Sequence, residues 1–232
     1  MKLKEKCSCK SNEQRKREDH CSPFSMGELQ QSINELNPDS APGDDQITNS
    51  IIQHLPENAK EILLNLFNES IDKDYFPSTW KKATITPILK PGRDAKHFDS
   101  YRPICLTSCL GKVLERMVKN RLTHFLETKN ILCPEQAGFR RMRSTQDQVM
   151  KITQEVADGL NHKPGKRTIL ALIDFSRAFD TVWHKGLLDK LIGYEIPTCM
   201  IHWIKSFLED RKTKVRFENA ESDYRGFKSG TP

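Results

Sequence analysis

The feature that most constrains the fold is a stripe of apolar residues that keeps helical spacing for more than four turns, over residues 110–126. This stripe predicts an amphipathic helix whose polar side carries Lys112 and Arg116. Two more helices are marked by Ser25 and Ser144, because a serine at such a position accepts a hydrogen bond from a free N–H of the first turn. Shorter apolar stripes predict further helices within residues 47–55, 62–71, 187–192 and 200–208.

Other segments have the residue types of β-strands. Residues 83–89 alternate and are rich in β-branched residues, and Pro87 predicts that this strand lies at an edge, because proline cannot donate to a neighbouring strand. Residues 168–173 form an apolar run, which predicts a buried strand ending at Asp174, and residues 213–217 predict another strand. Helices mixed with short strands indicate an α/β fold of the α+β type.

Positive charge is concentrated in the middle of the chain. The whole sequence has a formal net charge of +6, whereas residues 81–143 hold 14 Lys and Arg and 5 Asp and Glu, a net charge of +9. Residues 1–24 are polar and have no helical period, and we expect them to form a disordered basic tail. The central block points to a polyanionic partner, either nucleic acid or nucleotide phosphates, although a solvated basic face without a partner explains the charge equally well.

The composition excludes some classes of protein. The longest apolar stretch, residues 168–173, is far too short to span a bilayer, and the N-terminus lacks the apolar region of a secretory signal. We therefore expect an intracellular protein, cytoplasmic or nuclear, that is neither secreted nor membrane-bound, with its seven cysteines as reduced thiols. A zinc site at Cys7, Cys9, His20 and Cys21 is a weak alternative, because their spacing fits no common zinc finger.

The chemistry of the chain is best sought in motifs rather than in single residues. An aspartate after an apolar strand, such as Asp174, is usually a cap or turn residue, and alone it is a weak catalytic signal. Its surroundings are more specific, because it belongs to the last of five motifs. In chain order these are Ser40-Ala-Pro-Gly-Asp-Asp-Gln46, Trp80-Lys-Lys-Ala-Thr-Ile-Thr-Pro-Ile-Leu-Lys-Pro-Gly92, Tyr101-Arg-Pro-Ile-Cys-Leu-Thr-Ser-Cys-Leu-Gly-Lys-Val-Leu-Glu-Arg116, Glu135-Gln-Ala-Gly-Phe-Arg140 with Ser144-Thr-Gln146, and Leu172-Ile-Asp-Phe-Ser-Arg-Ala-Phe-Asp-Thr-Val-Trp-His184.

Together these motifs resemble, in type and in order, the reverse transcriptases of jockey-type, LINE-like non-LTR retrotransposons, over about residues 38–232. The resemblance implies a right-hand polymerase, with helix-rich fingers and short β-strands over residues 25–165 and part of the palm over residues 166–232. It implies an RNA-directed DNA polymerase that adds dNTPs to a primer 3′ hydroxyl. The implied partners are an RNA template, a DNA primer and dNTPs, and protein partners stay open. The implied cofactor is Mg²⁺, two ions in the complete enzyme, with Mn²⁺ as the alternative.

The resemblance also assigns roles to two residues of the last motif. It makes Asp174 a catalytic residue and the first ligand of the metal ions. It makes Phe179, five residues later, a gate under the sugar of the incoming nucleotide. The ring would clash with a 2′ hydroxyl, so deoxyribonucleotides would be selected, although an ordinary core aromatic is the alternative.

Basic residues of the earlier motifs are expected to contact phosphates. By the resemblance Arg102 and Lys90 bind the incoming triphosphate, and Arg93 and Lys96 are alternatives to Lys90. Arginine suits this role because its planar fork donates two parallel hydrogen bonds to phosphate. Contacts to the template or backbone, with a solvated face as the alternative, are expected of Lys112, Arg116, Arg140, Arg141 and Arg143.

One part of the family pattern is missing. The second catalytic motif ends in two adjacent aspartates, and no such pair follows Asp174; the pair Asp44-Asp45 stands far earlier, in the first motif. We therefore expect a fragment that does not polymerise alone, because one carboxylate cannot assemble a two-metal site. A group II intron maturase-like reverse transcriptase and a non-catalytic nucleic-acid-binding remnant are the alternative functions.

Overall fold

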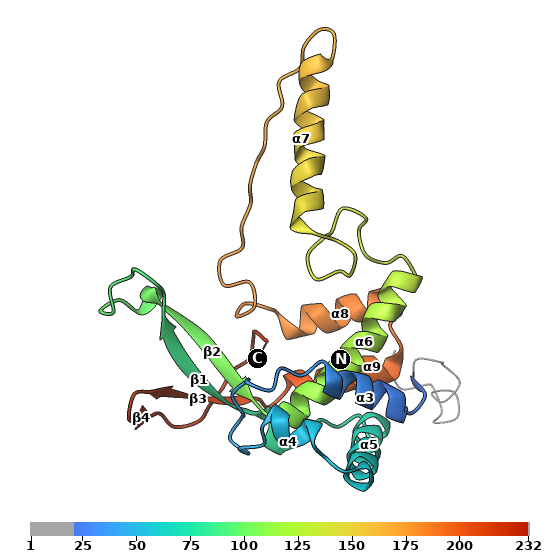
Figure 1. The fold of residues 1–232 in the computed structure, drawn as a ribbon, viewed down its shortest axis with the longest axis vertical. Helices are drawn as coiled ribbons and strands as arrows, with labels where there is room; N and C mark the ends of the chain where they lie inside the picture. The colour runs from blue at the N-terminus through green and yellow to red at the C-terminus, as the bar shows by residue number, and fades with distance from the viewer. Residues whose placement is uncertain (1–20, 232) are drawn as a thin grey trace. The chain divides into compact units, whose positions relative to one another are not determined.

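The computed structural model describes residues 21–231, which form two compact units (Figure 1). The first unit contains residues 21–125 together with residues 179–231, and the second contains residues 126–178. Every strand within the described residues belongs to the first unit. Residues 1–20, with Cys7, Cys9 and His20 of the zinc alternative, lie outside the described residues. The boundary between fingers and palm at residue 165 stays a prediction.

The helices of the first unit lie close to where the apolar periodicity predicts them. The long stripe forms α6 (Cys109–Thr128), and Ser25 begins α3 (Met26–Asn34). Ser25 Oγ accepts a hydrogen bond from the N–H of Glu28 (3.3 Å), and the Glu28 carboxylate accepts one from the N–H of Ser25 (2.8 Å), so the predicted capping box is confirmed. No helix in this described part of the chain is long and apolar enough to cross a membrane. Further helices are α4 (Asn49–Gln53), α5 (Glu57–Asp72), α8 (His184–Gly193) and α9 (Thr198–Leu208), with short 3₁₀ turns η2 (Ser78–Lys81) and η3 (Phe98–Ser100).

An aromatic cluster joins these helices into one core. Phe76 is 1% exposed, and its ring centre lies 5.8 Å from Trp80, 5.4 Å from Trp203 and 5.1 Å from Phe207, each edge to face. Such pairs add about 0.5–1.5 kcal/mol each to the free energy gained by burial. The apolar stripe of α6 belongs to the same core through Val113, Leu114 and Met117. The start of α6, which carries Lys112, is therefore anchored in the same core as α9.

The sheet has the strand order β2-β1-β3-β4, and β5 also pairs with β3. β1 (Lys82–Leu89) runs antiparallel to β2 (Tyr101–Thr107), from Ala83 opposite Thr107 to Leu89 opposite Tyr101. β3 (Lys212–Phe217) runs parallel to the first four residues of β1 only. The expected edge position of β1 is therefore wrong for residues 82–85, which lie between two strands, and right for Pro87, which pairs with β2 alone. The short strands are β4 (Ala220–Glu221) and β5 (Arg225–Gly226).

Residues 21–24, which the sequence placed in the tail, belong to the folded first unit. Phe24 is 5% exposed, and its N–H donates to the side-chain oxygen of Asn68 at 2.6 Å. The Arg121 guanidinium lies 4.1 Å from the centre of the Phe24 ring and donates to both carboxylate oxygens of Glu28, at 2.7 and 2.9 Å. Phe24 and Arg121 thus bind this segment to α3 and α6. The polar sequence of residues 1–24, which has no helical period, gives no sign of these contacts.

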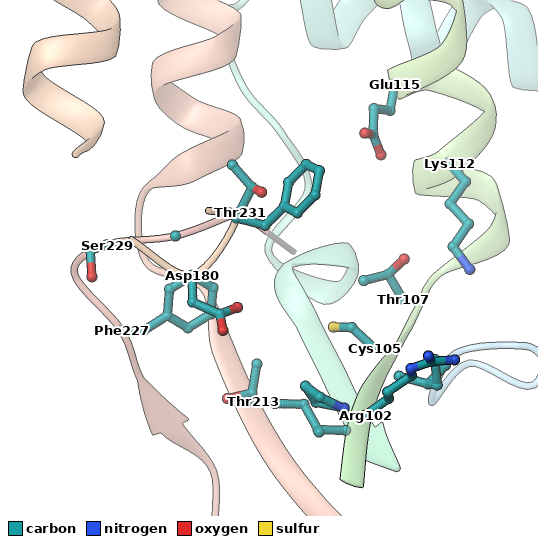
Figure 2. A pocket seen from close by; sticks show the side chains of 15 residues that line it. Arg102, Cys105, Thr107, Lys112, Glu115, Asp180, Thr213, Phe227, Ser229 and Thr231 are labelled. Carbon is teal, nitrogen blue, oxygen red and sulfur yellow. The ribbon is translucent and has the colours of Figure 1, made fainter. Parts of the chain in front are cut away.

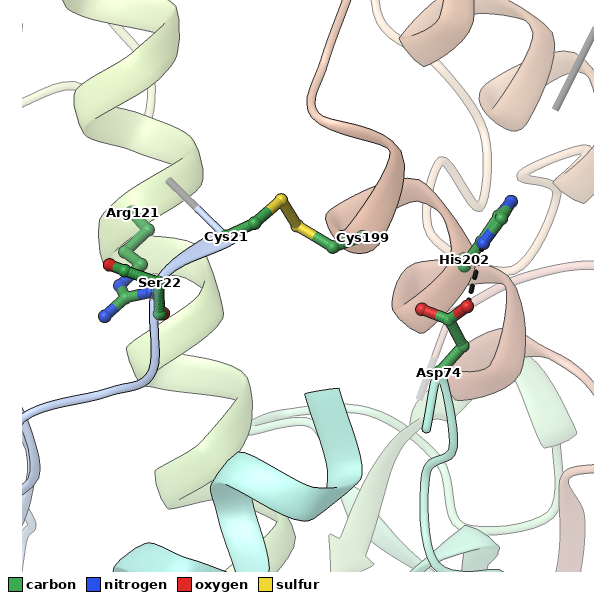
Figure 3. The surroundings of a disulfide bond; sticks show 6 residues. All are labelled: Cys21, Ser22, Asp74, Arg121, Cys199 and His202. Atoms are coloured by element: carbon green, nitrogen blue, oxygen red, sulfur yellow. Dashed lines mark hydrogen bonds and ion pairs between the residues drawn. A yellow bond between two sulfur atoms is a disulfide. The ribbon is translucent and has the colours of Figure 1, made fainter. Parts of the chain in front are cut away.

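The state of the cysteines also differs from the expectation. Cys21 and Cys199 form a disulfide that joins the start of the described chain to α9 (Figure 3). The expected reduced state agrees with the free thiols of Cys105, Cys109 and Cys133. The sequence could not indicate the disulfide, because 178 residues separate its two partners. Residues 21–231 contain no group of three or more His, Cys, Asp or Glu that could hold a metal ion, and Cys21, one residue of the zinc alternative, is bonded to Cys199.

The second unit contains α7 (Thr145–Asn161) and a long extended segment. Ser144 begins α7 with the predicted cap, accepting from the N–H of Asp147 at 3.1 Å. The buried strand predicted at residues 168–173 is wrong: these residues form no strand, and Ile169 is 90% exposed. A strand needs a neighbour that pairs with its backbone, and no strand within residues 21–231 pairs with this segment.

Candidate functional site

A large groove lies in the first unit, where the sheet meets the start of α6 (Figure 2). Its volume is about 1040 Å³, which is at the upper end of the range for ligand sites. Its walls are β2, the first two turns of α6, and the chain segments at residues 179–180 and 227–231. Segments that are distant in sequence therefore meet around one open space.

The groove brings together three residues that the sequence assigned to phosphate or nucleotide. Arg102 enters from β2 and Lys112 from α6, and Phe179 also lines the groove, with 64% of its surface exposed. In Figure 2 the side chains of Arg102 and Lys112 lie on the same side of the open space. Two cations and an accessible aromatic ring in one groove suit a phosphorylated ligand with a flat or cyclic part.

Two acidic residues that line the groove were assigned no role from the sequence. Glu115 stands three residues after Lys112 on the same face of α6, and Asp180 follows Phe179 directly. The Glu115 side chain is exposed to the groove. Desolvation by the surrounding protein raises the pKa of its carboxyl, and the charges of Arg211 and Lys112 oppose that rise. The helical spacing from Lys112 was the one signal that could have placed Glu115 at this site.

The first motif positions the groove, although its residues do not line it. Asp45 accepts a hydrogen bond from Ser108 Oγ at 2.6 Å. The side-chain oxygen of Ser108 accepts a hydrogen bond from the N–H of Gly111 (3.4 Å), and its carbonyl oxygen accepts one from the N–H of Lys112 (3.1 Å). Asp45 therefore fixes Ser108, the residue that directly precedes α6, one turn before Lys112.

The neighbouring carboxylate, Asp44, fixes the same loop to the sheet. It accepts a hydrogen bond from Thr84 Oγ1 of β1 at 2.7 Å and another from the hydroxyl of Tyr224. Lys214 of β3 places its ammonium nitrogen 3.8 Å from Asp44 Oδ1. The Asp44-Asp45 pair thus joins the sheet to α6 through these contacts.

Replacing Gly43 by alanine is expected to destabilise the fold by about 1–3 kcal/mol, as overpacking does in well-packed sites. A Cβ at this position would lie 2.7 Å from the backbone nitrogen of Ser108 and 2.8 Å from the carbonyl carbon of Thr107. Chemical denaturation measures the loss. Gly27→Ala is the matched control, because its Cβ would meet nothing closer than Ser25 Oγ at 3.8 Å. Equal stability of Gly43→Ala and the wild type would contradict the close approach of the loop.

The other residues predicted to bind nucleotide lie outside the groove. Lys90 follows β1 in the turn of the β1–β2 hairpin, and its ammonium group donates to the backbone oxygen of Asp99 at 2.7 Å. Asp174 lies in the second unit, on the extended segment, and is exposed. Their contacts with triphosphate and metal stay predictions.

The basic residues expected at a template divide into two kinds. Arg140 donates to both carboxylate oxygens of Glu127, at 2.9 and 2.6 Å, and to the carbonyl of Cys133 at 2.9 Å. The hydrogen bond from Arg140 lowers the pKa of Glu127, and Arg140 is thereby engaged in holding its own loop. Arg116 forms an ion pair with Glu35 at 3.4 Å. Arg141 and Arg143 are exposed, so they are the members of this set best placed to meet a nucleic-acid backbone.

Known proteins resemble this chain in sequence. Residues 88–232 match the model of the family described as reverse transcriptase (RNA-dependent DNA polymerase). The chain is 35% identical over 90% of its length to the probable RNA-directed DNA polymerase from transposon BS of Drosophila melanogaster. It is 34% identical over 91% of its length to the RNA-directed DNA polymerase from mobile element jockey of the same species. It spans 23% of the length of each of these relatives. The resemblance to jockey-type elements is thus confirmed, and the chain belongs to the reverse transcriptase family.

Proposed function

We propose that the polypeptide containing this chain is the RNA-directed DNA polymerase of a non-LTR retroelement, and that the groove binds its incoming dNTP. The observation that carries the proposal is the convergence of Arg102, Lys112 and Phe179 on one groove from three separate segments of the chain. Family membership supplies the reaction, and the groove supplies the place for its nucleotide.

Each side chain has a task that follows from its chemistry. Arg102 offers a planar fork of donors to the triphosphate, and Lys112 offers a mobile point charge at the same end. The Phe179 ring presents an apolar surface to the sugar, where a 2′ hydroxyl would lose its hydrogen bonds to water without finding a partner. These residues bind and orient the nucleotide, which lowers the entropic cost of bringing it to the primer terminus.

Asp174 is proposed as one carboxylate of the metal site in the complete polymerase. The reverse transcriptase family generally uses divalent metal ions, and two Mg²⁺ ions would neutralise the triphosphate and polarise the primer hydroxyl. Within residues 21–231 no three His, Cys, Asp or Glu side chains are arranged to hold an ion. The proposed role of Asp174 requires further carboxylates of the complete polymerase, because one carboxylate cannot assemble a two-metal site.

The basic block of residues 81–143 is proposed to follow the phosphates of the template or primer. Its net charge of +9 exceeds that of the whole chain. Counterions released from phosphates on binding favour such a contact, and added salt weakens it. Exposed Arg141 and Arg143 flank Met142, which is 98% exposed, so cations and an apolar surface for bases alternate in this loop.

The chain is expected to bind an RNA template annealed to a DNA primer with an affinity that falls steeply with salt. Fluorescence anisotropy at two or more salt concentrations gives the slope of log Kd against log salt. Arg141→Gln combined with Arg143→Gln should reduce that slope by about 1.4 to 1.8, because each lost phosphate contact removes about 0.7–0.9. Lys73→Gln is the control for charge, because Lys73 pairs with Glu69 on α5, outside the block. Equal affinity at all salt concentrations, or no binding at low salt, would contradict the proposal.

A further inference from the structure

The C-terminal part of the groove wall is held by a short set of backbone contacts. The N–H of Gly230 donates to the carbonyl of Val182 at 2.9 Å, and the N–H of Thr231 donates to the carbonyl of Phe179 at 3.0 Å. Residues 229–231 and residues 179–180 both line the groove, and Figure 2 shows Ser229 and Thr231 on the chain segment beside Asp180. We call residues 229–231 the docked segment. The docked segment and residues 179–180 therefore form adjoining parts of the groove wall.

The side chain of His184 makes a further contact with the docked segment. His184 begins α8, and its Nε2 lies 2.6 Å from the carbonyl oxygen of Gly230. A carbonyl oxygen only accepts hydrogen bonds, so Nε2 must carry the hydrogen. The imidazole is half-buried, where a lost hydrogen bond costs more than at the surface. His184 thereby ties the docked segment to the first turn of α8.

The glycine of the docked segment gives independent evidence of how closely it is held. Gly230 is buried and has a φ of +88°, a conformation that other residues rarely adopt. A Cβ at this position would lie 2.8 Å from the carbonyl oxygen of Asp180. Only glycine lets the backbone of the docked segment lie directly on the backbone that follows Phe179.

We propose that His184 is a positioning residue for nucleotide selection. Its Nε2–H holds the docked segment against residues 179–182, and this keeps the Phe179 ring at the place where it meets the sugar. Loss of the hydrogen bond should let the docked segment move away, widen the groove beside the ring and weaken the preference for dATP over ATP. This consequence rests on the proposed function, whereas the docking itself does not.

The test uses the 232-residue chain and two variants that differ only in the donor. His184→Gln places an amide N–H where Nε2–H lies, and His184→Leu has similar bulk but no donor. Amide hydrogen exchange followed by NMR reports on the docked segment, and titration with dATP and with ATP in Mg²⁺ buffer reports on selection. His184→Leu should speed exchange at Gly230 and Thr231 about fivefold or more and lower the ratio of dATP to ATP affinity about threefold or more, as expected for one lost hydrogen bond.

His184→Gln should restore wild-type behaviour in both measurements, which a merely structural loss at α8 would not allow. Gly230→Ala leaves the imidazole intact and should speed exchange at Thr231 as His184→Leu does. Unchanged exchange in His184→Leu, or equal effects of His184→Leu and His184→Gln, would overturn the proposal. If the wild-type chain binds neither nucleotide, both the nucleotide-binding role of the groove and the effect of His184 on nucleotide selection are overturned. The exchange rates alone then decide whether His184 holds the docked segment.

Discussion

Replacing Asp174 by asparagine in the complete polymerase is expected to lower the rate of dNTP incorporation by at least about a hundredfold, or ~2.7 kcal/mol of activation free energy. Asparagine keeps the size and the hydrogen-bonding atoms of the side chain but removes the negative charge that a divalent ion requires. Asp174 is exposed, so the substitution removes no buried contact and should leave the stability of the fold nearly unchanged. Single-turnover primer extension on an RNA template measures the rate.

The matched control for this prediction is Asp158→Asn. Asp158 lies on α7 in the same unit, and its carboxylate accepts from the side-chain amide of Gln154 at 2.7 Å, a contact of the surface only. Its rate should stay within about twofold of the wild type, the scale of a surface substitution. A rate for Asp174→Asn as high as that of the control would mean that Asp174 holds no metal ion.

Replacing Phe179 by valine in the complete polymerase is expected to lower the preference for deoxyribonucleotides at least about tenfold, or ~1.4 kcal/mol. The Phe179 ring lines the groove with 64% of its surface exposed, so a smaller side chain opens space on the groove side without leaving a cavity in the core. The ratio of kcat/KM for dATP to kcat/KM for ATP is the quantity to measure. The deoxyribonucleotide reaction itself should change less than the ribonucleotide reaction.

Phe175→Val is the control for the loss of an aromatic ring in the same motif. Phe175 is 79% exposed and lies in the second unit, outside the groove. Its substitution should leave the ratio unchanged. A ratio that is also unchanged in Phe179→Val would make Phe179 an ordinary packing residue, and the Asp174 prediction would then stand or fall separately.

The parts of the fold that could be predicted depend on local signals. The apolar stripe of α6 and the serine caps of α3 and α7 each act within a few residues, and all three helices form as expected. β2 was not predicted, because Tyr101–Thr107 includes Pro103 and does not alternate clearly. It becomes a strand through its seven-residue pairing with β1, a contact that only the tertiary structure reveals.

The segment at residues 168–173 shows the opposite error. Its apolar, β-branched composition predicts a buried strand, yet composition says only that a strand would be stable if a partner were present. Ile169 and Ile173 are 90% and 85% exposed, because nothing within the described residues pairs with this backbone. A strand is a property of two segments, and a sequence pattern describes one.

Only some residues of the candidate groove could be named from the sequence. Arg102 and Phe179 could be named from motifs, whereas the contact of His184 with Gly230 spans 46 residues and follows from no local pattern. The hydrogen bond of Asp45 to Ser108 spans 63 residues for the same reason. The motifs thus name side chains that line the groove, and the structure adds the contacts of His184 and Asp45 with neighbouring segments.

The most direct measurement of the central claim is photolabelling of the 232-residue chain with 8-azido-dATP in Mg²⁺ buffer, with the labelled peptides mapped by mass spectrometry. If the groove binds the incoming nucleotide, the label should appear on peptides from residues 101–115 and 179–184, unlabelled dATP should remove it, and Arg102→Ala should weaken it. Label that is confined to residues 126–178 or to the N-terminal tail, or that excess dATP does not displace, would contradict the account.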